Sequence, residues 1–357
     1  MSPGEQRLVL GIETSCDETA ASVVADGVRV LSNVIASQDE LHAEYRGVVP
    51  EIASRAHAER ILPVVRRALA DAGVGLGDVH AVAVGNRPGL IGCLLVGVGA
   101  AKALAWSLGV PFVGVDHIQA HMYAGCLDAT PPRFPALGLV VSGGHTSLYR
   151  VESWTSFTRL GGTIDDAVGE AFDKAATVLG LPFPGGPKLD ALADTPGADD
   201  LAVRFPVSRL AGGDREFSFS FSGLKTSLLY AAKGVPGPKG AAAPELTESR
   251  RADLAASFRR AAVEGVMLKV RAAINLFPRV DAAHRRTVLT GGGVTRNRLL
   301  REELEAWGRS RGLDVRLPSP AYCVDNAAMI AGLGFHLLEA RRWASDALSL
   351  SADPVSA

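Results

Sequence analysis

Runs of apolar residues alternate with polar and glycine-rich turns along the chain, a pattern typical of an α/β protein. Short runs bounded by turn residues predict strands, and longer runs with an apolar face every three to four residues predict helices. The predicted strands cover residues 8–12, 20–25, 29–37, 81–84, 112–115, 137–141, 147–151, 287–289 and 315–317. The predicted helices cover residues 50–72, 91–108, 166–179, 250–276 and 297–311, and an apolar helix closes the fold after residue 325.

Proline and glycine indicate where these elements are interrupted. Pro63 is expected to kink or divide the helix that begins at Pro50. Residues 85–89 (GNRPG) predict a tight loop, and residues 184–187 (PGGP) predict a turn. Residues 233–244 are rich in Gly, Pro and Ala, so we expect a flexible surface loop there.

The two halves of the sequence repeat one order of parts. Each opens with strand, polar turn and strand, and each later has strand, glycine loop, helix and strand. Counting from the glycine loops, Gly85 precedes His117 by 32 residues and Gly291 precedes Asp325 by 34. This spacing predicts that His117, His121 and Asp325 lie at equivalent strand ends and face one another across a cleft.

The duplication predicts a fold class as well. Glycine- and serine-rich turns in equivalent positions can bind the phosphates of one ligand through backbone N–H groups. Such equivalent turns are typical of the duplicated actin-like and Hsp70-like ATPase (ASKHA) architecture, an α/β fold with two subdomains around a nucleotide cleft. We expect residues 1–135, closed by a C-terminal helix over 325–345, to form the first half, and residues 136–324 to form the second.

Composition bears on the partners and the compartment. The chain has 357 residues and a net charge of -1, so binding nucleic acid would need a local basic patch or a partner protein. Four widely spaced cysteines without a CxxC pair are typical of free thiols in a reducing compartment. The first residues do not resemble a signal peptide, and the most apolar run, 90–101, predicts a buried helix rather than a membrane span. We therefore expect a cytoplasmic protein without membrane contact.

Two histidines supply the first candidate chemistry. His117 and His121 stand four residues apart at the start of a predicted helix, so they share one face and can hold a metal ion together. Alternatively, the two histidines are ordinary buried side chains that bind no metal ion. Further along, Asp166, Glu170 and Asp173 predict a helix face with three carboxylates.

Several basic residues are candidates for nucleic-acid or substrate contact. The arginine pairs are Arg66-Arg67, Arg259-Arg260 and Arg285-Arg286. Each pair is more typical of a solvated helix face, with nucleic-acid contact as the alternative. For Lys225 we likewise favour a solvated lysine over a substrate contact.

Six motifs occur along the chain. They are GIETSCDET at 11–19, GVVPE at 47–51, VSGGHT at 141–146, DDAVGEAFDK at 165–174, PGGP at 184–187 and FSFSGLKT at 219–226. Together they resemble the TsaD (Gcp) family, whose members are tRNA N6-adenosine threonylcarbamoyltransferases, and the resemblance covers nearly the whole chain.

The resemblance implies a reaction and its partners. The family binds threonylcarbamoyl-adenylate and transfers the threonylcarbamoyl group to N6 of the adenosine 3′ of the anticodon, in tRNAs that read ANN codons. AMP is released. The bacterial enzyme works with TsaB and TsaE, so the resemblance implies these partners together with tRNA.

The resemblance also implies the residues of the site. It assigns one metal ion, iron or zinc, to His117, His121 and Asp325. No general base is assigned. The adenine nucleotide is assigned to Val140, Val141, Ser142, Gly143, Gly144, Asp173, Gly186, Asp190 and Asn297.

Three positions depart from the family pattern. Gln119 stands where an acidic residue is frequent, Asn86 stands where Thr usually opens a Thr-x-Gly-Pro-Gly loop, and Val324 stands where Thr is common.

Three other functions are alternatives to the transferase. A metalloprotease of the HExxH type needs Glu after the first histidine, where this chain has Ile118. An ASKHA-type sugar kinase and a nucleotide-dependent assembly subunit are the remaining alternatives.

Overall fold

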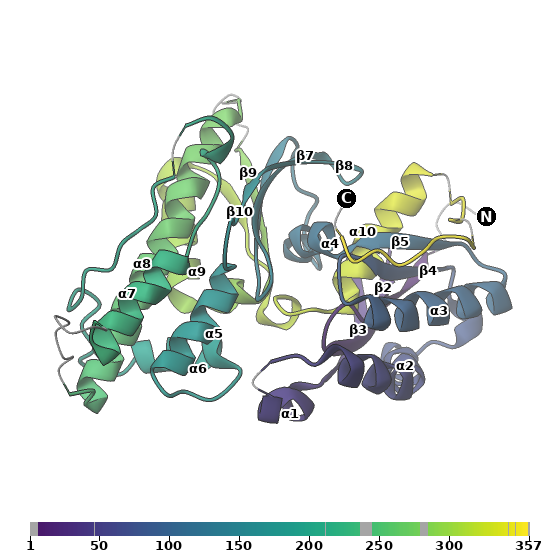
Figure 1. Cartoon of the computed structure of the whole chain (residues 1–357). Coiled ribbons are helices and arrows are strands. Elements are labelled where there is room, and N and C mark those ends of the chain that lie inside the picture. Colours follow the sequence, from purple (N-terminus) through teal and green to yellow (C-terminus); the bar gives the residue numbers. More distant parts are fainter. Residues whose placement is uncertain are drawn as a thin grey trace. The chain divides into compact units, whose positions relative to one another are not determined.

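The computed structural model describes residues 6–45, 47–210, 212–235, 245–278, 285–341, 343–346 and 348–355. The chain divides into two compact units, each with its own sheet (Figure 1). Unit 1 comprises Met1–Pro132, Glu152–Phe157 and Arg316–Ala357, and unit 2 comprises Arg133–Val151 and Thr158–Val315. Compared with the expected halves, unit 1 also includes the segments 152–157 and 316–324.

The sheet of unit 1 is built mainly from the buried apolar runs of the N-terminal sequence. Its strands are β1 (Leu8–Glu13), β2 (Glu18–Ala25), β3 (Arg29–Ser37), β4 (Ala81–Arg87) and β5 (Phe112–Asp116). They lie in the order β3-β2-β1-β4-β5. The first three pair antiparallel, as the predicted meander requires, whereas β1, β4 and β5 run parallel. The carboxyl ends of the three parallel strands therefore lie at one edge of the sheet.

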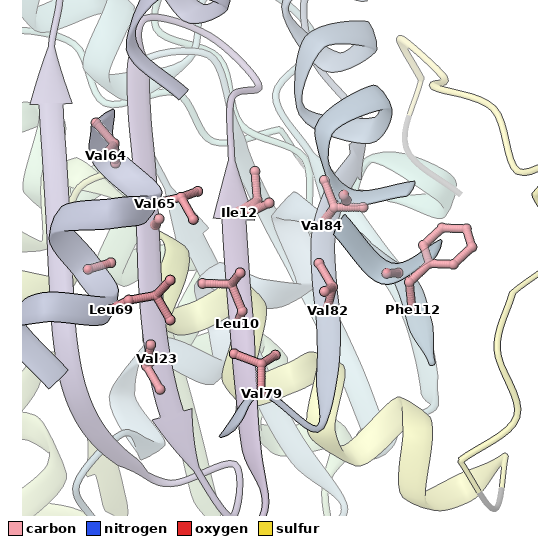
Figure 2. Close-up of a cluster of buried hydrophobic side chains, with 14 of the residues drawn as sticks. Leu10, Ile12, Val23, Val64, Val65, Leu69, Val79, Val82, Val84 and Phe112 are labelled. Carbon is pink, nitrogen blue, oxygen red and sulfur yellow. The ribbon is translucent and has the colours of Figure 1, made fainter. Parts of the chain in front are cut away.

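Helices cover both faces of this sheet. They are α1 (Asp39–His42), α2 (Pro50–Ala72), α3 (Ile91–Leu108), α4 (His117–Tyr123) and α10 (Ala327–Ala340). Leu10, Val23 and Val82 face α2 and α3 and form a buried cluster with Val65 (Figure 2). Because successive side chains of a strand point to opposite faces, Gly11 faces the other side, where α10 packs.

The sheet of unit 2 repeats the plan of unit 1. Its strands are β6 (Ala136–Val141), β7 (Thr146–Ser153), β8 (Ser156–Gly162), β9 (Thr287–Gly291) and β10 (Asp314–Arg316). Their order is β10-β9-β6-β7-β8, with β6 antiparallel to β7 and parallel to β9. Counted along the chain, the third, second, first, fourth and fifth strands are neighbours in both sheets, so the predicted duplication is confirmed.

The helices of unit 2 follow its strands, and short 3-10 helices connect elements in both units. The helices are α5 (Val168–Val178), α6 (Gly185–Ala193), α7 (Ser222–Lys233), α8 (Glu248–Ala273) and α9 (Arg298–Arg311). The 3-10 helices are η1 (Ala43–Tyr45), η2 (Leu76–Asp78), η3 (Ala124–Cys126), η4 (Gly213–Arg215), η5 (Ile274–Leu276), η6 (Gly293–Arg296) and η7 (Pro320–Tyr322).

The structure differs from three expectations about interruptions. Pro63 does not divide α2, and it lies on the exposed face, where water can satisfy the carbonyl that proline leaves unpaired. The GNRPG segment is not all loop, since β4 continues through a bulge to Arg87. The PGGP segment is not a free turn, since α6 begins at Gly185. Most of the expected flexible loop, residues 236–244, lies outside the described residues.

Helix α3 covers the run that was expected to form a buried helix, and it is buried on one face only. It is long and apolar enough to span a membrane by length and composition, and 33% of it is buried. Leu94 and Val98 are buried where α3 packs on β4 and α2, whereas Leu95 and Trp106 are exposed. This packing is that of a helix on one face of a sheet.

A close approach of β1 and α10 generates the first prediction. A Cβ atom at Gly11 would lie 2.2 Å from the Ala327 carbonyl oxygen and 2.9 Å from the Ala331 Cβ, so Gly11→Ala forces the helix away from the strand. We expect a loss of about 1–3 kcal/mol in the free energy of unfolding, measured by thermal or urea denaturation.

The matched control is Gly99→Ala in α3, where an added Cβ meets nothing within 4 Å. Alanine favours the helix by about 1 kcal/mol over glycine, so this variant should be as stable as the parent or more stable. Equal stability of the two variants would contradict the packing described for β1 and α10.

Candidate metal centre and nucleotide site

The two histidines begin a short helix at the end of β5. The Asp116 carboxylate caps α4 by accepting hydrogen bonds from the backbone N–H groups of Ile118 (2.9 Å) and Gln119 (3.1 Å). The following turn places His117 and His121 on one face, with ring centroids 4.6 Å apart. Both imidazoles are buried.

Asp325 completes a cluster with the two imidazoles. Its Oδ1 lies 3.1 Å from His121 Nε2 and 3.5 Å from His117 Nε2. One nitrogen or oxygen atom from each of the three residues lies within 4.8 Å of the others, as metal ligands require. The predicted meeting across a cleft between halves is wrong, because all three residues belong to unit 1. Asp325 stands just before α10, which packs on the same sheet as α4.

Glu13 is a residue of this centre that the sequence analysis missed. Its fully buried carboxylate accepts a hydrogen bond from His117 Nδ1 at 3.0 Å, and Ser15 Oγ lies 3.2 Å from the same nitrogen. This arrangement leaves Nε2 of His117 directed at Asp325. Between β1 and β5 lies β4, where a Cβ at Gly85 would be 2.5 Å from Glu13 Oε2. Glycine therefore makes room for the carboxylate to reach the histidine.

The electrostatics of the cluster are those of tightly packed opposite charges. Burial disfavours the charged form of His117, but the carboxylates of Asp325 and Glu13 outweigh it and raise the pKa of His117 well above its ordinary value. Burial and the neighbouring His117 lower the pKa of His121. Burial also opposes ionisation of Asp325, yet the two imidazoles hold the pKa of its carboxyl well below the usual range.

Further negative charge surrounds the centre. Burial, followed by the carboxylates of Asp325 and Asp17, raises the pKa of Glu18 well above its ordinary value. Repulsion between these carboxylates favours either protonation or a bound cation. The sequence signal for this feature is the run of carboxylate and hydroxyl side chains at 13–19 (ETSCDET).

The donor set fits a metal ion. Neither ring nitrogen of His121 makes a hydrogen bond of acceptable geometry in the described part of the chain, although the side chain is fully buried. Buried polar atoms without a partner are costly and uncommon. Two imidazoles and one carboxylate are also the ligand set of metal sites that keep positions open for substrate.

In unit 2, the turn between β6 and β7 presents free backbone N–H groups. Ser142 closes the turn, since its N–H donates to the His145 carbonyl (2.7 Å) and its Oγ accepts from the His145 N–H (3.1 Å). Gly143 and Gly144 are exposed, and their N–H groups donate to no other described residue. Two adjacent free N–H groups suit an anion such as phosphate.

The predicted face of three carboxylates is largely neutralised. Lys174 Nζ lies 2.6 Å from Asp166 and 2.8 Å from Glu170, and Lys225 Nζ lies 2.9 Å from Asp166. Lys225 is thus paired rather than solvated. Asp173 instead accepts hydrogen bonds from the first N–H groups of α6.

Asp173 holds the start of α6 in place. Its Oδ1 accepts from the N–H groups of Gly185 (2.8 Å) and Gly186 (2.9 Å). Burial raises the pKa of Asp173, although these two hydrogen bonds act in the opposite direction. The Gly186 N–H is therefore used within the protein, and Oδ2 of Asp173 is the oxygen left for a ligand.

Asp190 and Asn297 meet at the other end of α6. The Asn297 side-chain amide donates to Asp190 Oδ1 at 2.7 Å, and its Oδ1 caps α9 by accepting from the Leu300 N–H at 3.0 Å. Asp190 is held in addition by Arg259, with a distance of 2.7 Å from NH1 to Oδ1. The structure thus brings Asp190 and Asn297 together.

Comparisons with known proteins agree with the motifs. A family model described as tRNA N6-adenosine threonylcarbamoyltransferase (TsaD) matches residues 29–332. The curated protein of that name from Pelobacter propionicus is 49% identical over 334 residues, covering 93% of this chain and 92% of its own length. The one from Symbiobacterium thermophilum is 50% identical over 335 residues, with coverages of 93% and 92%.

Solved structures support the fold assignment. Full-length HypF in a phosphate- and nucleotide-bound form is 14% identical and aligns with a TM-score of 0.57, covering 95% of this chain and 56% of that one. At this identity the likeness concerns the fold alone, and it confirms the predicted duplicated α/β architecture of ASKHA type. From its sequence matches over nearly its whole length, the chain belongs to the tRNA N6-adenosine threonylcarbamoyltransferase family.

Proposed function

We propose that this protein transfers a threonylcarbamoyl group from threonylcarbamoyl-adenylate to N6 of the adenosine 3′ of the anticodon, in tRNAs that read ANN codons, with release of AMP. The observation that carries the proposal is the sequence identity of about one half with named transferases over 93% of the chain. The buried cluster of His117, His121 and Asp325 supports a role for a metal ion in this reaction.

In this proposal unit 1 supplies the metal centre. His117, His121 and Asp325 would hold one iron or zinc ion. A bound ion would act as a Lewis acid that polarises the carbamoyl carbonyl. Glu13 keeps the proton of His117 on Nδ1 and leaves Nε2 as the ligand atom. The buried setting of the two imidazoles excludes water from competing contacts.

Unit 2 supplies the adenylate contacts. The free N–H groups of Gly143 and Gly144, in the turn that follows Val140, Val141 and Ser142, would bind the phosphate. Asp173 and Asp190 would accept hydrogen bonds from hydroxyl groups of the ligand, with Gly186 and Asn297 fixing their positions. Because an adenine amine is a poor nucleophile, we expect positioning and charge stabilisation to provide most of the rate.

The same proposal implies partners and a compartment. The net charge of -1 offers no overall attraction to tRNA, so a partner that helps to hold tRNA is physically reasonable. We propose that TsaB and TsaE are these partners, as the family resemblance implies. A tRNA substrate also implies that the protein works in the cytoplasm.

One assay tests the function against its alternatives. The protein is incubated with threonylcarbamoyl-adenylate and unmodified tRNA, together with TsaB and TsaE, and the tRNA is digested to nucleosides and analysed by mass spectrometry. We expect threonylcarbamoyladenosine. If ATP and sugars instead yield a sugar phosphate, the protein is a kinase, and nucleotide binding without any turnover would indicate an assembly subunit.

Loss of a ligand should remove the metal. We expect His121→Ala and Asp325→Ala to lower the metal content per chain, measured by elemental analysis of the purified protein, and to reduce transfer by at least about 100-fold. His80→Gln is the control, because the imidazole of His80 accepts a hydrogen bond from the Leu8 backbone N–H and is not one of the three proposed ligands. Full metal occupancy in both ligand variants would refute the proposed centre.

Loss of the charge on Glu13 should weaken the metal without removing a ligand. We expect Glu13→Gln to reduce metal affinity about 10–100-fold, measured by competition with a chelator. Glu51→Gln is the matched control, since its carboxylate lies on α2 with 75% of the side chain exposed. An affinity equal to that of the parent protein would mean that Glu13 does not orient His117.

A further inference from the structure

Arg259 is a buried cation in α8 that the sequence analysis interpreted as part of a solvated pair. Its side chain is 8% exposed, whereas that of the adjacent Arg260 is 26% exposed. A buried guanidinium is stable only where hydrogen bonds and opposite charges compensate its lost hydration. Its partners therefore indicate what it does.

The partners of Arg259 lie in the last turn of α6 and just beyond it. NH1 lies 2.7 Å from Asp190 Oδ1, 2.7 Å from Asp194 Oδ1 and 3.2 Å from the Asp190 carbonyl oxygen. NH2 donates to the Ala193 carbonyl oxygen at 3.4 Å. The last carbonyls of a helix lack partners within the helix, and a cation there is favourable. Arg259 thus caps the carboxyl end of α6.

Helix α6 is consequently held at both ends. Asp173 accepts hydrogen bonds from its first two N–H groups, and Arg259 binds its last turn. This short helix carries Gly186 and Asp190, which belong to the proposed adenylate site. Its exact placement therefore sets where a ligand meets the carboxylate of Asp190.

The two oxygens of Asp190 have different roles. Oδ1 is shared by Arg259 NH1 and the Asn297 amide, each at 2.7 Å. Among the described residues, Oδ2 has a single long contact, of 3.4 Å from the Arg298 N–H, and the side chain is 20% exposed. Fixing Oδ1 leaves Oδ2 as an oriented acceptor for a hydroxyl group.

We propose that Arg259 is a positioning residue that orients Asp190 to bind the ribose hydroxyls of the adenylate. The inference rests on the proposed function, because it takes Asp190 as part of the nucleotide site. Arg259 does not contact the ligand. It acts through Asp190 Oδ1 and through the end of α6.

The test compares two probes that differ only in the ribose, AMP and 2′,3′-dideoxy-AMP, by calorimetric titration of the full chain. The ratio of their dissociation constants isolates the hydroxyl contacts from general effects on the fold, which change both constants equally. A hydrogen bond to a charged group corresponds to about tenfold or more, so the parent protein should prefer AMP by that factor. Arg259→Met should lower the ratio several-fold, as Asp190→Ala should, and the preference that remains would come from the hydroxyl contact of Asp173.

Two further variants serve as a control and as a substitute in this test. Arg260→Met should keep the parent ratio, because Arg260 Nε donates to the Asp200 carbonyl and NH1 lies 3.4 Å from Glu264. If Arg259→Met does not fold, the ratio of the two dissociation constants is measured for Arg259→Lys instead, since lysine keeps the charge but lacks the planar guanidinium group. We expect a lowered ratio for this variant, and an unchanged ratio would overturn the inference.

The failures are distinguishable. If Asp190→Ala lowers the preference for AMP and a folded Arg259→Met keeps the parent ratio, the inference is wrong and the nucleotide site stands. If the parent protein shows no preference, or Asp190→Ala keeps it, the assignment of Asp190 to the nucleotide is wrong and the inference falls with it.

Discussion

The hydrogen bond between the buried carboxylate of Glu13 and Nδ1 of His117 is the interaction on which the centre in unit 1 depends. It joins the ends of β1 and β5 across β4, and it requires that Gly85 carry no side chain. Because a buried carboxylate is stable only with a partner, the same bond also explains why a charged residue can end a strand with 0% exposure. The chemistry and the fold of this unit therefore constrain each other at one contact.

The two units use one strand order for different chemistry. In both, the turn after the first strand lies beside the carboxyl ends of parallel strands, where ligands of α/β proteins generally bind. In unit 1 this position carries carboxylates and imidazoles that attract a cation. In unit 2 it carries Gly143 and Gly144, whose free N–H groups attract an anion. Duplication thus provided two equivalent positions that acquired opposite electrostatic character.

Several polar residues of unit 2 are held in place by hydrogen bonds within the protein. Asp173 binds backbone N–H groups, Asn297 caps α9, and Asp190 is tied to Asn297 and Arg259. Each residue keeps one polar group occupied inside the protein, so the other is held in a defined direction. Such support is what a site needs in order to bind a ligand without reorganising.

The sequence alone determined the class of fold and most of its elements. Apolar runs and their turns predicted nine of the ten strands, and the repeated order of parts predicted two sheets of the same topology. These features are local, or they repeat, so one chain suffices to detect them. Among the elements that were missed, α1 is a single turn, β8 has mixed polarity, and α6 and α7 begin at glycine and serine residues that also form turns.

For the candidate site, too, the sequence predicted some features and the tertiary structure decided others. The spacing of His117 and His121 was enough to place both on one helical face, because that depends only on the period of a helix. The repeated spacing also predicted that Asp325 would join them. The support from Glu13 and the burial of Arg259 but not of Arg260 were decided by the tertiary structure alone. These facts depend on how distant segments pack, and a residue's burial and partners are properties of that packing rather than of its neighbours in the sequence.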